Sequence, residues 1–381
     1  MSYDTHLKKW EEQRSGITEE SWKKLNMLLR TKDATQIRSS FELLFSYGEA
    51  SLCAILHEKN EQLYLRNKSH HPVLWISCIL EEVRQEKSVW HDLYTRNYFH
   101  RLERYWYGNV AWKDLSEEHQ KKAREKSLRS VEVPAGSFVM GPVTGFDTEN
   151  IRHKVTLTRP MNIGVYPCTQ ALYESVMGEN PSKFVGSMRP VDNVSWCDTV
   201  LFCNKLSEIE GLQPCYTLPV GLERIRRYSW KDRSVDFLSD EVKWNKEASG
   251  YRLPTEAEWE YCARGGEEHY YAGSNVVYHV AWYYENARYR TYPVGERRGN
   301  KFGLYDMSGN VWEFCWAFYV YSEGVDAIDP IGDERYMNQG CPRRGGSYNT
   351  IAIDMSVDLS ESRSPSCRSS NTGFRLIRTL L

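Results

Sequence analysis

The 381-residue sequence has no apolar run that approaches the ~18 residues of a transmembrane span. Its start, "MSYDTHLKKWEEQRSG", lacks the apolar segment of a secretory leader. Acids and bases nearly cancel to a formal net charge of −2, so the chain lacks the strongly basic balance typical of proteins that bind nucleic acid or anionic membranes. We therefore expect a cytoplasmic protein that has no membrane span and binds no nucleic acid.

Cysteine pairs with metal-binding spacing are also lacking. The ten cysteines include no CxxC and no Cys/His pair at zinc-site spacing, so each is expected to be a reduced thiol, mostly buried. Aromatic residues, in contrast, are plentiful, with 13 Trp and 25 Tyr. Such side chains combine a large contact area with a polar group, which suits irregular cores and contact surfaces alike.

Residues 1–130 have the pattern of a helical domain. Trp22, Leu25 and Leu29 fall on one face of a predicted helix, and further apolar stripes follow along the chain. The charged segment at 113–130 predicts a solvated last helix or linker. Because antiparallel helix pairs usually mediate contacts, we expect this domain to bind a protein partner or to self-associate.

Residues 131–381 have a different texture, with frequent Gly, Pro, Asn and Trp and many turn signals. Only "WCDTVLFCNKLSEIEG" and "TEAEWEYCARGG" predict helices, and the second begins with a capping box formed by Thr255 and Glu258. The remainder predicts short strands and long loops. This half is therefore expected to be an α+β domain with little regular structure.

Six sequence blocks occur in a fixed order in this half. They are Gly136-Ser137-Phe138 with Met140-Gly141, "RPVDNVSW" at 189–196, "GYRLPTEAEWEYCARGG" at 250–266, "GLYDMSGNVWEF" at 303–314, "RRGGS" at 343–347 and "GFRL" at 373–376. In these blocks the chain resembles the sulfatase-modifying-factor or formylglycine-generating-enzyme domain family. The resemblance implies a variant of the C-type lectin fold.

Charged residues in the blocks have expected structural roles. The planar guanidinium groups of Arg344 and Arg375 suit bidentate pairing with acids such as Asp306 or Glu313. The carboxylates of "TEAEWE", Glu256 and Glu260, are instead expected on the helix surface.

Members of this family that oxidise a substrate cysteine carry two copper-binding cysteines after the GGS motif. The matching positions here are Thr350 and Met355, and neither is a thiol. Cys341 and Cys367 flank the segment at other offsets and are expected to be free thiols. The HxxxHxE motif of the related iron-dependent sulfoxide synthases is absent as well. We expect no catalytic residues; the alternatives are an oxidase or synthase with another metal arrangement, and a structural partner in a larger assembly.

The chain end also resembles the variable proteins of diversity-generating retroelements, with "WEFCW" at 312–316, Gly345-Gly346-Ser347-Tyr348, Pro365 and Gly373-Phe374-Arg375. The resemblance implies a variable region at 312–376 whose outward residues bind a protein ligand. The expected contact residues are Trp316, Ala317, Tyr319, Tyr321, Tyr348, Asn349, Thr350, Ala352, Asp354, Glu361, Ser364, Ser366, Ser369, Ser370 and Asn371.

Alternating apolar residues within that region predict a half-buried strand over 351–359, with Ile351, Ile353, Met355, Val357 and Leu359 on one face. The family resemblance further implies a structural calcium ion near the "GNVWE" turn, with oxygens of Asn310, Val311 and Glu313 as ligands. No other cofactor is expected.

Overall fold

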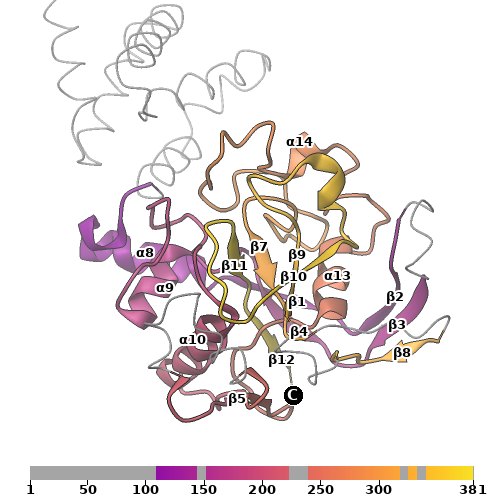
Figure 1. Cartoon of the computed structure of the whole chain (residues 1–381), viewed down its shortest axis with the longest axis horizontal. Helices are drawn as coiled ribbons and strands as arrows, with labels where there is room; N and C mark the ends of the chain where they lie inside the picture. Colours follow the sequence, from indigo (N-terminus) through magenta and orange to yellow (C-terminus); the bar gives the residue numbers. More distant parts are fainter. Residues whose placement is uncertain (1–108, 144–151, 223–238, 318–324, 333–339, 381) are drawn as a thin grey trace, which may run out of the picture. The chain divides into compact units, whose positions relative to one another are not determined.

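The structure is a computed structural model that describes residues 109–143, 152–222, 239–317, 325–332 and 340–380 (Figure 1). Most of the expected helical domain, up to residue 108, lies outside the described residues, and so do Tyr319 and Tyr321. The chain from Tyr107 to Leu381 forms one compact unit. No helix in its described part is both long and apolar enough to cross a membrane.

Helix α8 (Glu117–Ser127) follows a short 3-10 helix, η2 (Trp112–Asp114), at the start of the described residues. Ser116 caps α8 by accepting a hydrogen bond from the His119 amide. The helix packs against α9 (Gln170–Met177), and the Ser127 hydroxyl hydrogen bonds with Thr169. The charged segment that we assigned to the N-terminal half thus contributes a helix to the C-terminal unit.

A three-stranded antiparallel sheet joins the beginning of this unit to its end. Its order is β1 (Ser130–Val133), β4 (Met161–Gly164) and β12 (Ile377–Thr379). Ile163 in the central strand pairs with Val131 on one side and with Ile377 on the other. The chain end is therefore tied into the same sheet that starts the domain.

A four-stranded sheet carries the expected variable region. Its order is β10 (Ser360–Arg363), β9 (Cys341–Arg344), β7 (Trp312–Phe314) and β11 (Thr372–Phe374). Strands β7 and β11 are parallel, with Gly373 opposite Glu313, and the other pairs are antiparallel. Residues 345–359 and 364–371 are therefore connections whose ends are held by strands.

Most of the remaining strands and helices are short, as the sequence predicts. They are β2 (Gly136–Met140), β3 (His153–Leu157), β8 (Ala327–Ile328), β5 (Tyr216–Thr217), β6 (Lys243–Trp244), α10 (Trp196–Ile209), α13 (Glu256–Arg264) and α14 (Val277–Val280). Helices α10 and α13 confirm the two predicted helices, and Thr255 and Glu258 form the predicted capping box. The expectation that these are the only helices after residue 130 was wrong, because α9 and α14 are helical as well. The α+β architecture with little regular structure is confirmed.

Buried ion pairs stabilise the four-stranded sheet and connect it to α13. Arg375 pairs with Glu313 at 2.8 Å, as expected, and both side chains are buried. Arg344 pairs with Glu256 at 3.0 Å and with Glu260 at 3.1 Å. The expectation that these two glutamates lie on the helix surface was wrong, because their face of α13 packs on β9 and they neutralise a buried guanidinium.

Candidate functional site

Two separate connections of the C-terminal region meet at the surface. The Asn371 amide nitrogen donates to the Asn349 side-chain oxygen at 3.0 Å, and the Ser369 hydroxyl donates to the Asn371 oxygen at 2.6 Å. We call Asn349, Ser369, Ser370 and Asn371 the Asn patch. The patch combines short, neutral polar side chains that are exposed or half-buried. Such groups can both donate and accept hydrogen bonds to a ligand.

Tyr348 is buried beneath the Asn patch and contacts it through its hydroxyl group. Its side chain is only 4% exposed, so the expectation of an exposed ring was wrong. The ring meets the edge of Phe184 at 5.5 Å, and its hydroxyl hydrogen bonds with Ser370 at 3.1 Å. Burial raises the pKa of Tyr348. The ring is a core residue of which only the polar end reaches the patch.

Thr350 and Met355 occupy the positions where copper-binding family members carry thiols. The Thr350 hydroxyl hydrogen bonds with the hydroxyl of Ser347 at 2.9 Å. Met355 is fully buried in a cluster with Val280 and Ala281. A hydroxyl and an enclosed thioether do not form the thiolate pair that Cu(I) binding there requires. Cys341, which is buried, and Cys367, which is half-buried, flank the segment.

The predicted strand over 351–359 is wrong. Residues Ala352–Met355 form a 3-10 helix, η4, which lies beside α14 (Figure 1). Ile351 and Ile353 are consequently exposed, Ile353 by 68%, whereas Val357 is buried. Asp354 is exposed, as expected for a contact residue, and Ala352 is half-buried.

Trp316 and Ala317 are not surface residues, which corrects their expected role as ligand contacts. Both are buried, and the Trp316 ring stacks on Tyr216 with centroids 4.9 Å apart. Trp196 and Trp244 also pack against this ring. The aromatic residue that follows β7 thus completes the core around α10.

Arg343 links Glu361, another of the predicted contact residues, to the Asn patch. It pairs with Glu361 at 2.6 Å and donates to the Asn371 oxygen at 3.3 Å. Ser364 and Ser366, on the connection after β10, hydrogen bond with each other at 3.0 Å. Sequence reasoning missed Arg343, since its side chain is buried and its role depends on residues far along the chain.

Two exposed tyrosines outside the expected variable region also lie beside the site. The Tyr284 amide donates to the Thr350 carbonyl at 3.0 Å. The hydroxyls of Tyr284 and Tyr289 are 2.8 Å apart. The only signal in the sequence is the aromatic density of "WYYENARYR", which does not reveal its tertiary neighbours.

Two of the three residues expected to bind calcium, Glu313 and Asn310, do not fit the ion. Glu313 accepts hydrogen bonds from Arg375 and, at 2.7 Å, from the Trp259 indole. The Asn310 oxygen accepts from the Tyr292 amide at 3.0 Å. Calcium prefers six to eight oxygen ligands, and these side-chain oxygens are already engaged. Among the described residues, no three His, Cys, Asp or Glu side chains are grouped to hold a metal.

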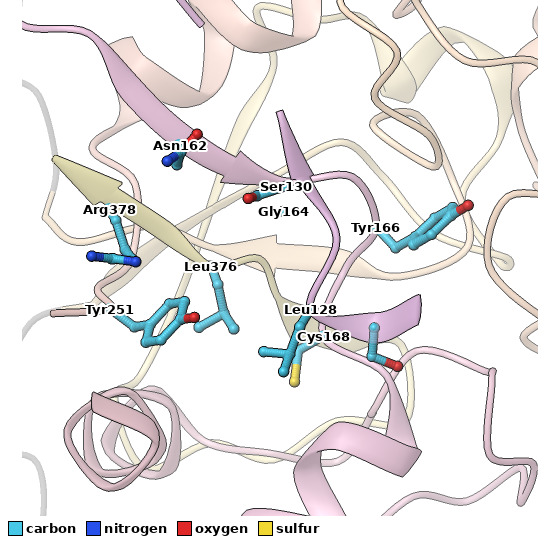
Figure 2. A pocket seen from close by; sticks show the side chains of 10 residues that line it. Leu128, Ser130, Asn162, Gly164, Tyr166, Cys168, Tyr251, Leu376 and Arg378 are labelled. Atoms are coloured by element: carbon cyan, nitrogen blue, oxygen red, sulfur yellow. The ribbon is translucent and has the colours of Figure 1, made fainter. Parts of the chain in front are cut away.

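A small hollow lies against the three-stranded sheet, away from the Asn patch in sequence (Figure 2). Leu128, Cys168, Tyr251 and Arg378 are among its lining residues, and none of the lining residues belongs to 312–371. Its volume of about 40 Å³ accommodates a few water molecules rather than a substrate.

The sequence and the fold are similar to those of known proteins. The family model described as "Sulfatase-modifying factor enzyme 1-like domain" matches residues 115–380. The solved structure of Treponema denticola variable protein 1 matches with a TM-score of 0.59 and 33% identity, covering 65% of this chain and 94% of that chain. The formylglycine-generating enzyme of Streptomyces coelicolor is 29% identical over 295 residues, which are 66% of this chain and 90% of that relative.

The chaperone protein LppX of Paenibacillus barcinonensis is 40% identical over 185 residues, which are 42% of this chain. The match spans 63% of the length of that relative.

Proposed function

This chain belongs to the family of sulfatase-modifying factor enzyme 1-like domains and is related to the variable proteins of diversity-generating retroelements; from this premise we propose that it binds a protein ligand through the Asn patch and catalyses no reaction. The observation that carries the proposal is the pair of side chains at the family's copper positions. Thr350 and Met355 lack thiols, while the neighbouring polar residues Asn349 and Asp354 are exposed.

The scaffold under the patch suits a surface whose residues change. The connections that carry the Asn patch are anchored by β9, β10 and β11, and the strands are held by buried ion pairs. Loops on such a rigid scaffold can be altered at little cost in stability. The amide nitrogen of Asn349 has no hydrogen-bond acceptor among the described residues, so it can donate to a ligand.

Replacing the two amides of the patch tests the proposal. The double variant Asn349→Ala/Asn371→Ala should fail to capture the protein ligand from an extract of the source organism, because the donors and acceptors of the patch are removed. The control variant Asn162→Ala changes an amide at the hollow of Figure 2 and should capture normally. Capture by the double variant at the wild-type level would exclude the Asn patch as the binding surface.

The proposed diversification has a separate genetic test. A near-identical copy of the codons for 310–376 should lie beside a reverse transcriptase gene and differ from them mainly at adenines. Without such a copy, the chain is a binding protein with a constant surface.

An enzymatic role is the second candidate, since the Streptomyces relative named a formylglycine-generating enzyme matches 66% of this chain. Purified protein loaded with Cu(I), and separately with Fe(II), should then consume oxygen with a cysteine-containing peptide. Turnover that depends on Met355 would overturn the proposal, whereas no turnover with either metal supports it.

A further inference from the structure

A ladder of rings and guanidinium groups lies next to the Asn patch. The Arg297 guanidinium lies 4.6 Å from the Tyr278 ring and 3.7 Å from the Trp282 ring. The Trp282 ring stacks on the Tyr292 ring, with the two centroids 3.8 Å apart. The Arg290 guanidinium lies 5.0 Å from the centroid of the Tyr292 ring. Stacking fixes the two arginines without using a carboxylate.

Two exposed tyrosines continue this surface. Tyr289 precedes Arg290 in the chain and is 60% exposed, and its ring meets the edge of Tyr284 at 5.2 Å. Arg288 and Tyr289 both have left-handed backbone, with φ of 50° and 56°. Consecutive residues with side chains rarely adopt this conformation, and such unfavourable backbone is concentrated at sites that bind ligands. Here the left-handed backbone at Arg288 and Tyr289 accompanies the contact of the Tyr289 ring with Tyr284.

The ladder is rigidly attached to the scaffold of the Asn patch. The Asn310 amide donates to the Trp282 carbonyl at 2.7 Å, and the Tyr284 amide donates to Thr350. Met355 packs against α14, whose residue Tyr278 begins the ladder. A ligand that covers Asn349 and Thr350 is therefore next to Tyr284.

The charge of this surface is unbalanced. In the described part of the chain, Arg288, Arg290 and Arg297 form no ion pair with a carboxylate. Glu296, next to Arg297, has one carboxyl oxygen buried without a hydrogen-bond partner among the described residues, and burial raises its pKa to about 8. The exposed carboxylate in the same segment is Glu285. Guanidinium groups that stack on rings keep N–H groups free for carboxylate ligands.

We propose that these residues form a constant flank of the binding site that takes an acidic segment of the protein ligand. The Tyr–Arg flank consists of Tyr278, Tyr284, Arg288, Tyr289, Arg290 and Arg297. The inference rests on the proposed function and adds the chemistry of the partner: the flank supplies affinity for carboxylates, and the Asn patch supplies specificity. Tyrosine and arginine are the residue types that most often dominate binding energy at protein interfaces.

A peptide probe tests the flank separately from the natural ligand. A fluorescein-labelled peptide in which glutamate alternates with leucine should bind the full chain, and its lysine counterpart should not. Binding, measured by fluorescence anisotropy, should weaken as ionic strength rises above about 0.15 M, because exposed charges are then screened.

Two variants locate the binding. Arg288→Asn/Arg290→Gln should weaken peptide binding about tenfold, since two guanidinium groups are lost; asparagine tolerates the left-handed backbone at 288. Tyr284→Ala should weaken it by a similar factor. The control Arg159→Ala removes an exposed arginine elsewhere and should bind as wild type. Unfolding midpoints of all variants verify that each is folded.

Different results separate the flank from the Asn patch. The variant Asn349→Ala/Asn371→Ala should retain peptide binding even though it loses the natural ligand; this combination supports both proposals. Unchanged peptide binding by the arginine variant, or equal binding of the lysine peptide, overturns the flank while leaving the Asn patch standing. Tighter binding of a single-stranded oligonucleotide than of the glutamate peptide also overturns it, in favour of a nucleic-acid partner.

Discussion

Two sets of arginines in this domain have opposite environments. Arg344 and Arg375 are fully buried, and each is paired with carboxylates of residues that lie far away in the chain. Arg290 and Arg297 stack on aromatic rings and, within the described residues, have no carboxylate partner. The paired set holds helices and strands together, whereas the stacked set remains available to a ligand. The same side chain therefore marks the scaffold in one place and the proposed binding surface in the other.

The largest expected loss of stability comes from replacing Arg344, one of the two arginines that are paired with buried carboxylates. Arg344→Met leaves Glu256 and Glu260 buried without their cation and should reduce the free energy of unfolding by about 3–5 kcal/mol. Arg290→Met should reduce it by less than about 1 kcal/mol, because no buried carboxylate loses its partner. Chemical denaturation of both variants measures the difference. Equal losses would show that the two sets do not differ in structural role.

An intermediate loss of stability is expected at Gly346, which lies between β9 and Asn349 in the chain. Gly346 has a φ of 72°, and an added methyl group would collide with the Met355 side chain. Gly346→Ala should therefore lower the free energy of unfolding by about 1–3 kcal/mol. The matched variant is Gly178→Ala, which has a φ of 75° and open space around it. If both variants lose the same stability, the contact with Met355 contributes nothing.

A smaller, pH-dependent effect on stability is expected at Asp192, a buried residue whose carboxyl lies near Tyr348. Burial raises its pKa to about 7, and its Oδ2 atom has no hydrogen-bond partner in the described part of the chain. Because the neutral form is favoured in the fold, its stabilising contribution is present below the ordinary pKa of aspartate and is lost as pH rises through about 7.

Asp192→Asn removes that titration. Between about pH 6 and about pH 8, the stability of the variant relative to wild type should rise by on the order of 1 kcal/mol, because the unfolded chain releases the Asp192 proton at lower pH than the fold does. Thermal unfolding at the two pH values checks the result. A constant difference across this range would contradict a raised pKa at Asp192.

Errors of sequence interpretation occurred where a residue's neighbours lie far along the chain. Glu256 and Glu260 look like surface residues of a short helix until the helix is placed on β9. Trp316 follows a strand in the expected variable region, but its ring completes a core formed with Tyr216. The apolar alternation over 351–359 indicated a strand, yet Met355 packs on α14 and the backbone turns as η4.

The sequence by itself determined the family, the helices α10 and α13 with the capping box of Thr255 and Glu258, and the identities of Thr350 and Met355. These features depend on residue type and on local spacing, which the sequence contains directly. Only the tertiary structure decided that Asn349 meets Asn371 and that Tyr284 adjoins Thr350. Such contacts join distant residues through packing of the whole domain, and no local pattern encodes them.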